Sequence, residues 1–370
     1  MTTQIVVLGG GYTGLGAAKL AARWTGAQVT LVNASDRFVE RVRMHQLASG
    51  QRLRDLPLRE LLAKTGVRLV VDKVVAVDPD SRTVRLEVGA PIAYDQLIYA
   101  LGSRADLDSV PGVREHAFTV ASHDQAVDLR ERLRQAGQTV AVVGGGLTGI
   151  EAASELAETY PDLKVRLLTN GTLGAAVSRK AQHHLRKVFA RLGVDVRENA
   201  RVVEVRADGV LLAENEHVGA DTVVWTAGFE VSPLAAEAGF EVDARGRMVV
   251  DDTLRSVSHP DVIGIGDAAA MHRETGQELR MACATGLPTM QQAVRAMANR
   301  MHGKPAKPVG FRFFNQCISL GRRDGLVQFV RGDDSPREAI LTGRAAALYK
   351  ETIVRGTVIF ENHPTMPASV

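Results

Sequence analysis

Three glycines near the start of the chain, Gly9, Gly11 and Gly14, have the G-x-G-x-x-G spacing that can cradle a pyrophosphate. The first glycine permits a tight turn, the second lets phosphate groups approach the backbone, and the third lets the following helix pack closely against the preceding strand. The phosphates would then meet the free N–H groups and the positive end of the helix dipole. This spacing predicts a dinucleotide site at the first loop of the chain.

The same spacing returns at Gly144, Gly146 and Gly149. Each copy follows an apolar run that is typical of a buried strand and precedes a helical run rich in small residues. Each unit also closes with an apolar strand ending in a small residue and a glycine, at residues 97–102 and 223–228. Because both copies have the full strand–loop–helix–strand context, two chance turns explain them poorly. The duplication therefore predicts two dinucleotide-binding units.

A third glycine cluster ends in an acid. An apolar run leads into Gly264-x-Gly266-Asp267. A carboxylate at the end of a strand can accept hydrogen bonds from a polyol, while the neighbouring backbone N–H groups meet a phosphate. If this cluster stood alone, a turn capped by Asp267 would explain it equally well.

The second strand of each unit ends without the acid that usually binds a ribose hydroxyl in such folds. Asn33 and Thr169 stand there instead. Asn33 can still hydrogen-bond a ribose, but it carries no charge. Residues 36–54 then bring several cations, for which a solvated helix is the default expectation. The alternative is a loop folded over the cofactor, with some of the cations facing a phosphate or a substrate.

The composition bounds the class of protein. The chain has 370 residues, 45% of them hydrophobic, which is enough for two or three domains with cores of their own. Lys and Arg number 45 against 42 Asp and Glu, mixed along the chain, which argues against a nucleic-acid-binding protein. We expect neither a signal peptide nor a transmembrane helix, and the expected compartment is the cytoplasm.

The two cysteines, Cys283 and Cys317, are far apart and form no C-x-x-C motif. A redox-active disulfide of that type and a zinc ribbon are therefore not expected, and no metal site is predicted. We assign both thiols to the hydrophobic core.

The last part of the chain changes in pattern. A long helix is expected within residues 280–301, beginning near Pro288. Residues 311–320 and 326–330 are predicted to form a β-hairpin. A helix over 339–353 and a disordered tail after Asn362 are expected to follow.

The two glycine motifs, the two strand ends and the G-x-G-D segment, in this order, resemble the two-dinucleotide flavoprotein reductases of the pyridine nucleotide-disulfide oxidoreductase superfamily. Residues 149–156, 281–299 and 319–325 are similar to type II NADH dehydrogenases and to the apoptosis-inducing-factor-like ferroptosis-suppressor quinone reductases. The absence of a redox-active Cys pair separates the chain from the glutathione-reductase-like branch.

The resemblance implies an α/β fold with two Rossmann-like domains, one for FAD and one for NAD(P), and a small C-terminal α+β domain. The implied boundaries are residues 1–113 and 252–310 for the FAD domain, 114–251 for the NAD(P) domain and 311–370 for a C-terminal interface domain.

The resemblance also implies the binding residues. Those for FAD are Gly9, Gly11, Tyr12, Thr13, Gly14, Asn33, Val74, Ala100, Gly102, Gly266 and Asp267. Those for NADH or NADPH are Gly144, Gly146, Leu147, Thr148, Gly149, Thr169 and Gly228. Residues 281–285, including Ala282, would border the flavin and the acceptor site.

The implied activity is transfer of hydride from NAD(P)H through the flavin to a quinone or another small acceptor. Glu151 is the candidate catalytic residue near the nicotinamide, although an acid favoured by the helix dipole explains it almost as well. The lack of an acid at Thr169 makes NADPH as plausible as NADH, with Arg179 or Lys180 holding the 2′-phosphate.

Three alternatives stay open. The chain could hand electrons to an acidic iron–sulfur protein, as ferredoxin or rubredoxin reductases do; it could sense redox state without turnover; or it could serve a biosynthetic reaction. Gln291 and Gln292 are expected to face solvent, and no membrane-anchoring amphipathic helix is evident. A monomer or homodimer is expected, with peripheral membrane contact left open.

Overall fold

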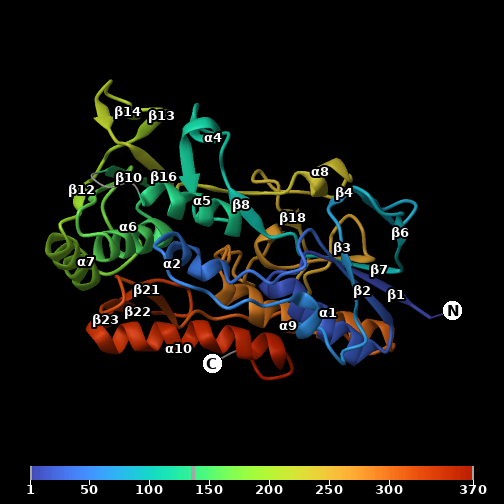
Figure 1. The fold of residues 1–370 in the computed structure, drawn as a ribbon. Helices are drawn as coiled ribbons and strands as arrows, with labels where there is room; N and C mark the ends of the chain where they lie inside the picture. Colours follow the sequence, from blue (N-terminus) through green and yellow to red (C-terminus); the bar gives the residue numbers. More distant parts are fainter. Residues whose placement is uncertain (1, 135–137, 369–370) are drawn as a thin grey trace.

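Two parallel five-stranded sheets carry the two predicted units (Figure 1). The structure is a computed structural model that describes residues 2–134 and 138–368. The first sheet has the strands β19 (Val262–Gly264), β7 (Gln96–Tyr99), β1 (Gln4–Leu8), β2 (Gln28–Asn33) and β3 (Arg68–Val71), in that order. The second has β12 (Asp195–Arg197), β11 (Lys164–Leu168), β10 (Thr139–Val143), β16 (Thr222–Trp225) and β9 (Ala117–Thr119).

Smaller elements complete the two units. The helices are α1 (Tyr12–Thr25), η1 (Arg41–Arg43), α2 (Met44–Ala48), α3 (Leu58–Leu61), α4 (Val113–His116), α5 (His123–Leu133), α6 (Leu147–Thr159), α7 (Arg179–Leu192), α8 (Leu234–Glu237), η2 (Gly266–Ala268) and α9 (Cys283–Met301). The short strands are β4 (Val74–Asp78), β5 (Thr83–Leu86), β6 (Ile92–Ala93), β8 (Ser103–Ala105), β13 (Val202–Arg206), β14 (Gly209–Leu212), β15 (His217–Gly219), β17 (Phe229–Val231), β18 (Met248–Val249) and β20 (Ala269–Ala270).

The two sheets have the same local register, as the duplication predicts. Leu8 pairs with Val32 where the first glycine loop begins, and Val143 pairs with Leu168 where the second begins. The first sheet takes β19 from beyond the second unit, so the chain leaves the first unit and returns to it. The predicted α/β fold is confirmed, while the domain boundaries stay a prediction.

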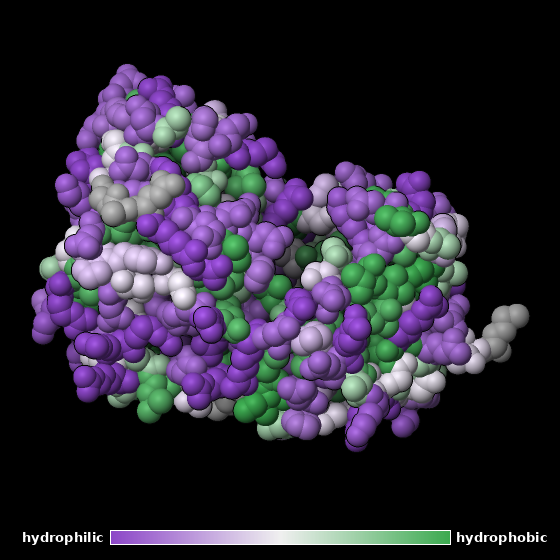
Figure 2. Space-filling model, in the orientation of Figure 1, coloured by the Kyte–Doolittle hydropathy of each residue, from purple (hydrophilic) through white to green (hydrophobic). Residues whose placement is uncertain are grey.

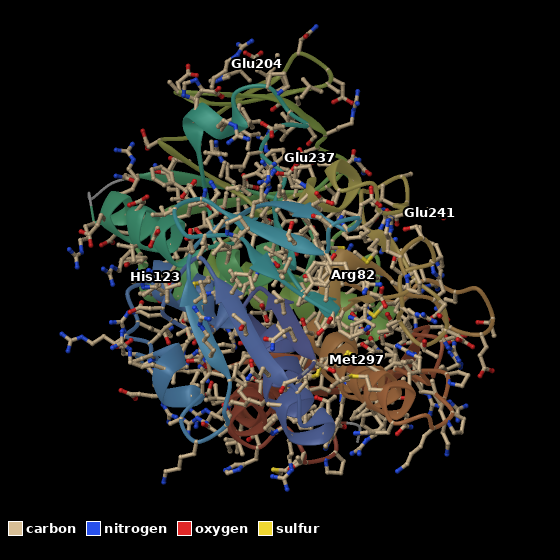
Figure 3. All side chains as sticks on the ribbon, turned by 90° about the vertical axis from the view of Figure 1, so that its right-hand side faces the viewer. Arg82, His123, Glu204, Glu237, Glu241 and Met297 are labelled. Carbon is tan, nitrogen blue, oxygen red and sulfur yellow. The ribbon has the colours of Figure 1, made fainter. Side chains whose placement is uncertain are left out.

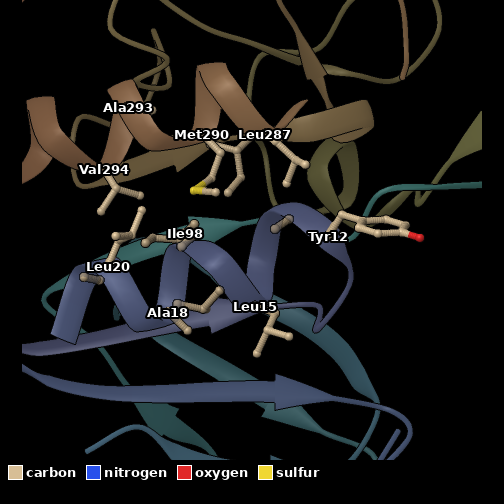
Figure 4. Close-up of a cluster of buried hydrophobic side chains, with 14 of the residues drawn as sticks. Tyr12, Leu15, Ala18, Leu20, Ile98, Leu287, Met290, Ala293 and Val294 are labelled. Atoms are coloured by element: carbon tan, nitrogen blue, oxygen red, sulfur yellow. The ribbon is translucent and has the colours of Figure 1, made fainter. Parts of the chain in front are cut away.

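The core of the first unit forms between α1 and α9. Leu287, Met290 and Val294 of α9 point toward α1 (Figure 4). A Cβ at Gly16 would lie only 2.7 Å from Met290 Cε, so this glycine permits the close approach of the two helices. Burial of such side chains stabilises each by roughly 1.5–3 kcal/mol. Figure 3 shows the contrast between buried Met297 and exposed acids such as Glu237.

The same packing explains why α9 begins earlier than predicted. The helix starts at Cys283 and contains Pro288, which was expected to mark its start. Proline removes one backbone donor from a helix. The helix continues through it because Leu287 and Met290, on either side, are buried against α1.

The C-terminal part forms an antiparallel sheet and a long helix. β21 (Asn315–Ser319), β22 (Gly325–Val330) and β23 (Pro336–Thr342) pair in order, and α10 (Gly343–Asn362) follows. α10 runs beneath both units and contacts β21, β22 and α1 (Figure 1).

Two predictions for this part were wrong in detail. The predicted helix over 339–353 begins only at Gly343, because the preceding residues pair with the edge of β22, whose N–H and C=O groups need partners. The predicted strand over 311–320 covers only Asn315–Ser319.

The segment 36–54 is not a solvated helix. It forms a loop with the short helices η1 and α2, and every residue of α2 is buried. Met44, Leu47 and Ala48 fill the space between α5 and α6, so tertiary packing overrides the charged composition. The alternative, a loop folded over the cofactor with some cations facing a phosphate or a substrate, stays a prediction.

The described part of the C-terminal tail is held in place, contrary to the predicted disorder. Gln291 Nε2 donates to the carbonyls of Pro364 and Met366, at 2.8 Å each. Gln292 Nε2 donates to the Gly310 carbonyl at 2.9 Å. These two glutamines therefore bind neighbouring backbone rather than simply facing solvent. Residues 369–370 lie outside the described part.

Candidate active site

A single cavity of about 1680 Å³ lies between the two units and extends to the C-terminal sheet and α10. Figure 2 shows the surface hollowed between the two lobes. Fifteen predicted site residues line it: Gly9, Gly11, Tyr12, Thr13, Asn33, Val74, Ala100, Gly102, Leu147, Thr148, Glu151, Gly228, Gly266, Asp267 and Ala282. Five do not: Gly14, Gly144, Gly146, Gly149 and Thr169.

The first glycine loop has the geometry that a pyrophosphate needs. Gly9 has φ +96°, in the region that favours glycine. A Cβ at Gly14 would collide with the Gly9 carbonyl, so this glycine packs the helix onto the strand and lies behind the loop. A Cβ at Gly11 would meet nothing within 4 Å. The open space at Gly11, at the N-terminus of α1, is where a phosphate can approach.

Asn33 shapes this loop. Its Oδ1 accepts the Gly10 N–H at 2.7 Å, and its Nδ2 donates to the Ser35 carbonyl at 2.8 Å. Both polar ends of the side chain are therefore used within the protein. A ribose contact by Asn33, which also lines the cavity, stays a prediction.

The second loop repeats the arrangement. Gly144 has φ +120°, and a Cβ at Gly149 would collide with the Gly144 carbonyl. A Cβ at Gly146 would again meet nothing within 4 Å. The Thr169 side chain lies directly behind Gly145, in the place that Asn33 takes behind Gly10.

The G-x-G-D segment lies against the first loop. A Cβ at Gly266 would be 2.7 Å from Thr13 Oγ1. The Ser103 hydroxyl donates to Asp267 Oδ2 at 2.7 Å, and Arg41 Nη1 donates to the Ser103 carbonyl at 2.6 Å. Arg41 lies 3.9 Å from the Asp267 carboxylate. Arg41 is thus one cation of the 36–54 segment that lines the cavity.

Glu151 lies in a buried polar cluster in the cavity wall. Its Oε1 accepts the Ser319 N–H at 3.0 Å and contacts the Lys350 ammonium. Its Oε2 is 4.0 Å from His45 Nδ1. An acid placed there only by the helix dipole would not need these side-chain and backbone partners. Sequence reasoning missed Lys350 and Ser319, because no local pattern links them to Glu151.

Burial sets the protonation of this cluster. Burial, with Arg43 adding to it, lowers the pKa of Lys350 to about 7. Burial also lowers the pKa of His45 well below its usual range, and the charges of Lys350, Arg322 and Arg43 act in the same direction. The Lys350 ammonium, which titrates near neutrality, can exchange a proton with a bound acceptor. The His45 imidazole is neutral at that pH.

Both cysteines are half-buried and line the cavity. Cys283 also packs against the core of the first unit, so the core assignment holds in part for Cys283 and was wrong for Cys317. Burial raises the pKa of Cys283 to about 12 and that of Cys317 to about 11. Both remain thiols at neutral pH and form no disulfide.

Nearby, Arg280 stacks on Phe313 at 4.8 Å and pairs with Asp334.

Two parallel dinucleotide units that share one cavity define a two-dinucleotide oxidoreductase fold. Residues 3–298 match the pyridine nucleotide-disulphide oxidoreductases, and the chain belongs to this family. It is an oxidoreductase enzyme.

The chain is similar to an NADH dehydrogenase-like protein of Mycobacterium tuberculosis, with 30% identity over 95% of this chain and 93% of the relative. It is 28% identical to an alternative NAD(P)H-ubiquinone oxidoreductase of Arabidopsis thaliana, over 89% of this chain and 74% of the relative. Its fold matches the sulfide:quinone oxidoreductase structure from Aquifex aeolicus with a TM-score of 0.82 and 19% identity, over 98% of this chain and 92% of that one.

Proposed function

We propose that the protein is an FAD-dependent NAD(P)H:quinone oxidoreductase. The observation that carries this proposal is that both glycine loops and the Glu151–Lys350 pair line or adjoin one cavity. When bound, FAD supplies the chemistry that accepts a hydride and passes on its electrons. The chain supplies binding, orientation and protons.

The residues present fit FAD at the first loop. The open space at Gly11 admits a pyrophosphate, and the N–H groups at the start of α1 have no acidic side chain competing in the first turn. Asp267 and Ser103 offer polar groups to the rest of the cofactor, with Arg41 balancing the carboxylate charge.

A quinone is the acceptor class that the site supports best. The Arabidopsis relative is named for ubiquinone, and part of the cavity is lined by apolar side chains such as Phe313, Phe360 and Leu287. Reduction of a quinone consumes two electrons and two protons. Glu151 and Lys350 lie where they can hold a proton at the cavity wall.

An apolar acceptor also needs a route from its apolar environment into the cavity. The side chains of Leu348, Ile353 and Ile359 on α10 are 69%, 42% and 54% exposed, and Ile353 also lines the cavity. Figure 2 shows hydrophobic patches along the edge where α10 lies. We propose that this face makes peripheral contact with a membrane. Among the described residues, no helix has the length and apolar character of a membrane span.

Transfer to an acidic iron–sulfur protein is less well supported. That alternative relies on the cations of residues 36–54 as a docking surface. Arg41 instead lies in the cavity wall, and Arg43 is buried in ion pairs with Glu40 and Glu351. Arg37, Arg52 and Arg54 of the segment are exposed. Buried, paired cations attract a distant acidic partner only weakly.

Either nicotinamide nucleotide fits the second loop. Thr169 brings no charge that would repel a 2′-phosphate. Arg179 and Lys180 begin α7 beside Glu338 of β23, whose carboxylate accepts the Lys180 N–H at 3.2 Å and would compete with a phosphate for these cations. The Ala200 N–H donates to the Thr169 carbonyl at 2.8 Å, and the next residue, Arg201, is exposed. We propose Arg201 as the cation for the 2′-phosphate.

The test has two steps. Purified protein should carry FAD, and anaerobic mixing with NADH or NADPH should bleach the flavin absorbance. Turnover should then be measured with short-chain ubiquinone and menaquinone analogues, oxygen and a small ferredoxin. Fastest turnover with the quinones is the expected result. Flavin that stays oxidised would favour a redox sensor, and salt-sensitive turnover with ferredoxin alone would favour the iron–sulfur alternative.

A further inference from the structure

A second buried carboxylate lies one turn along α6 from Glu151. Glu155 has no exposed surface, and within the described residues its Oε2 has no hydrogen-bond partner. Glu158 follows, half-buried, near the end of the helix. Positions i, i+4 and i+7 of a helix share one face. The three carboxylates therefore form a line from the cavity wall toward the surface.

α2 and the residues after it lie along this line. His45 Nδ1 is 4.0 Å from Glu151 Oε2. Six residues later, Gln51 Nε2 donates to Glu155 Oε1. Each of the two inner carboxylates thus has a polar partner from the same segment.

The turn between β21 and β22 lies along the same carboxylates. The Ser319 N–H donates to Glu151 Oε1 at 3.0 Å, and Arg322 Nε lies 3.9 Å from Glu155 Oε1. The Arg322 N–H also donates to Glu158. The Arg322 side chain is 43% exposed, so this end of the line reaches solvent.

The charges around Glu155 suit a carboxyl that gains and loses a proton. Burial raises its pKa to about 7; Arg322 opposes this shift and Glu158 adds to it. Gln51 is the remaining polar partner and is uncharged. Farther in, Ser319 Oγ lies 3.3 Å from His45 Nε2.

We infer that Glu155 is a proton-relay residue that carries a proton from solvent near Arg322 to the Glu151–Lys350 pair. This inference rests on the proposed quinone reduction. The overall reaction is NAD(P)H + H⁺ + quinone → NAD(P)⁺ + quinol. The hydride brings two electrons and one proton, and the second proton comes from solvent. Ser319 Oγ, which is also 3.3 Å from Glu151 Oε1, connects the inner end of the relay with His45.

The test compares acceptors that do and do not need a proton. In the FAD-loaded Glu155→Gln enzyme, flavin reduction by NADH and turnover with ferricyanide should stay within about twofold of the wild type, because neither requires a proton from this route. Turnover with a ubiquinone analogue should fall about tenfold or more, with a larger solvent isotope effect. Glu155→Asp should restore part of the quinone activity.

Glu361→Gln is the matched control, because Glu361 is also fully buried with a raised pKa but lies on α10, outside the line. It should leave the quinone-to-ferricyanide ratio unchanged. An equal loss with both acceptors in Glu155→Gln would show a structural role and overturn the relay, as would full quinone turnover. A wild-type enzyme that fails to reduce quinones would instead contradict the proposed function itself.

Discussion

The Lys350 ammonium contacts Glu151 Oε1, although 199 positions separate the two residues in the chain. The contact joins α10 of the C-terminal part to α6 of the second unit at the cavity wall. One ion pair therefore links the C-terminal helix to the chemistry proposed for the site.

Removing one partner of this pair should be costly. Lys350→Met leaves the Glu151 carboxylate buried without its cation, which destabilises the fold by about 3 kcal/mol. The double variant, Glu151→Gln with Lys350→Met, should regain most of the lost stability, because it leaves no unpaired buried charge. Urea denaturation of the three variants measures this. Equal stability of the single and double variants would contradict a coupled pair.

Glu151→Gln should separate the two halves of the reaction. Flavin reduction by NADH needs no proton from the cluster, so its rate should stay within about threefold of the wild type. Turnover with a quinone should fall by about 10²-fold, the usual range for loss of a general acid or base. Stopped-flow and steady-state rates provide the measurement. A loss confined to flavin reduction would place Glu151 in nicotinamide binding instead.

Adding one methyl group to either glycine loop should affect only the nucleotide that binds at that loop. Gly11→Ala adds a Cβ that meets no protein atom within 4 Å, so the chain should fold normally but lose FAD. Gly146→Ala, in the equivalent open position, should keep FAD and bind NAD(P)H at least tenfold more weakly. Flavin absorbance per chain and nucleotide titration distinguish the two. Loss of FAD in Gly146→Ala rather than Gly11→Ala would reverse the assignment of the loops.

Nucleotide preference should depend on Thr169 and Arg201. The wild type should use NADPH and NADH with kcat/KM values within about tenfold of each other. Thr169→Glu should lower kcat/KM for NADPH alone, by about tenfold or more, which corresponds to about 1.4 kcal/mol of transition-state free energy. Arg201→Ala should weaken binding of 2′,5′-ADP, whereas Arg179→Ala should not. Strict NADH preference in the wild type would contradict this role for Arg201.

The free energy of unfolding should decrease as the pH rises, because of the Glu155 carboxyl. Its pKa is raised from 4.5 to about 7 in the folded state. Below pH 4.5 the carboxyl is protonated in both states; between 4.5 and 7 the unfolded state ionises first and is favoured. Relative to the wild type, Glu155→Gln should therefore gain roughly 3 kcal/mol between pH 4.5 and 8, at about 1.4 kcal/mol per pKa unit. A constant difference across this range would contradict the raised pKa.

The two nucleotide units could be predicted from the sequence because their signals are local. The roles of Gly9, Gly11 and Gly14 depend on neighbours within one turn of chain, and their repeat at residues 144–149 has the same spacing. A buried parallel strand also leaves a continuous apolar run that can be found without knowing its partners.

Only the tertiary structure decided how the rest of the site is assembled. Glu151, Lys350, His45 and Ser319 come from four segments far apart in the chain, and no periodicity relates them. Burial then sets their protonation, which the residue types alone do not determine. Residues 43–49 of the charged segment are buried for the same reason: long-range packing of α2, which local composition does not reveal, outweighed the preference of Arg43 and His45 for solvent.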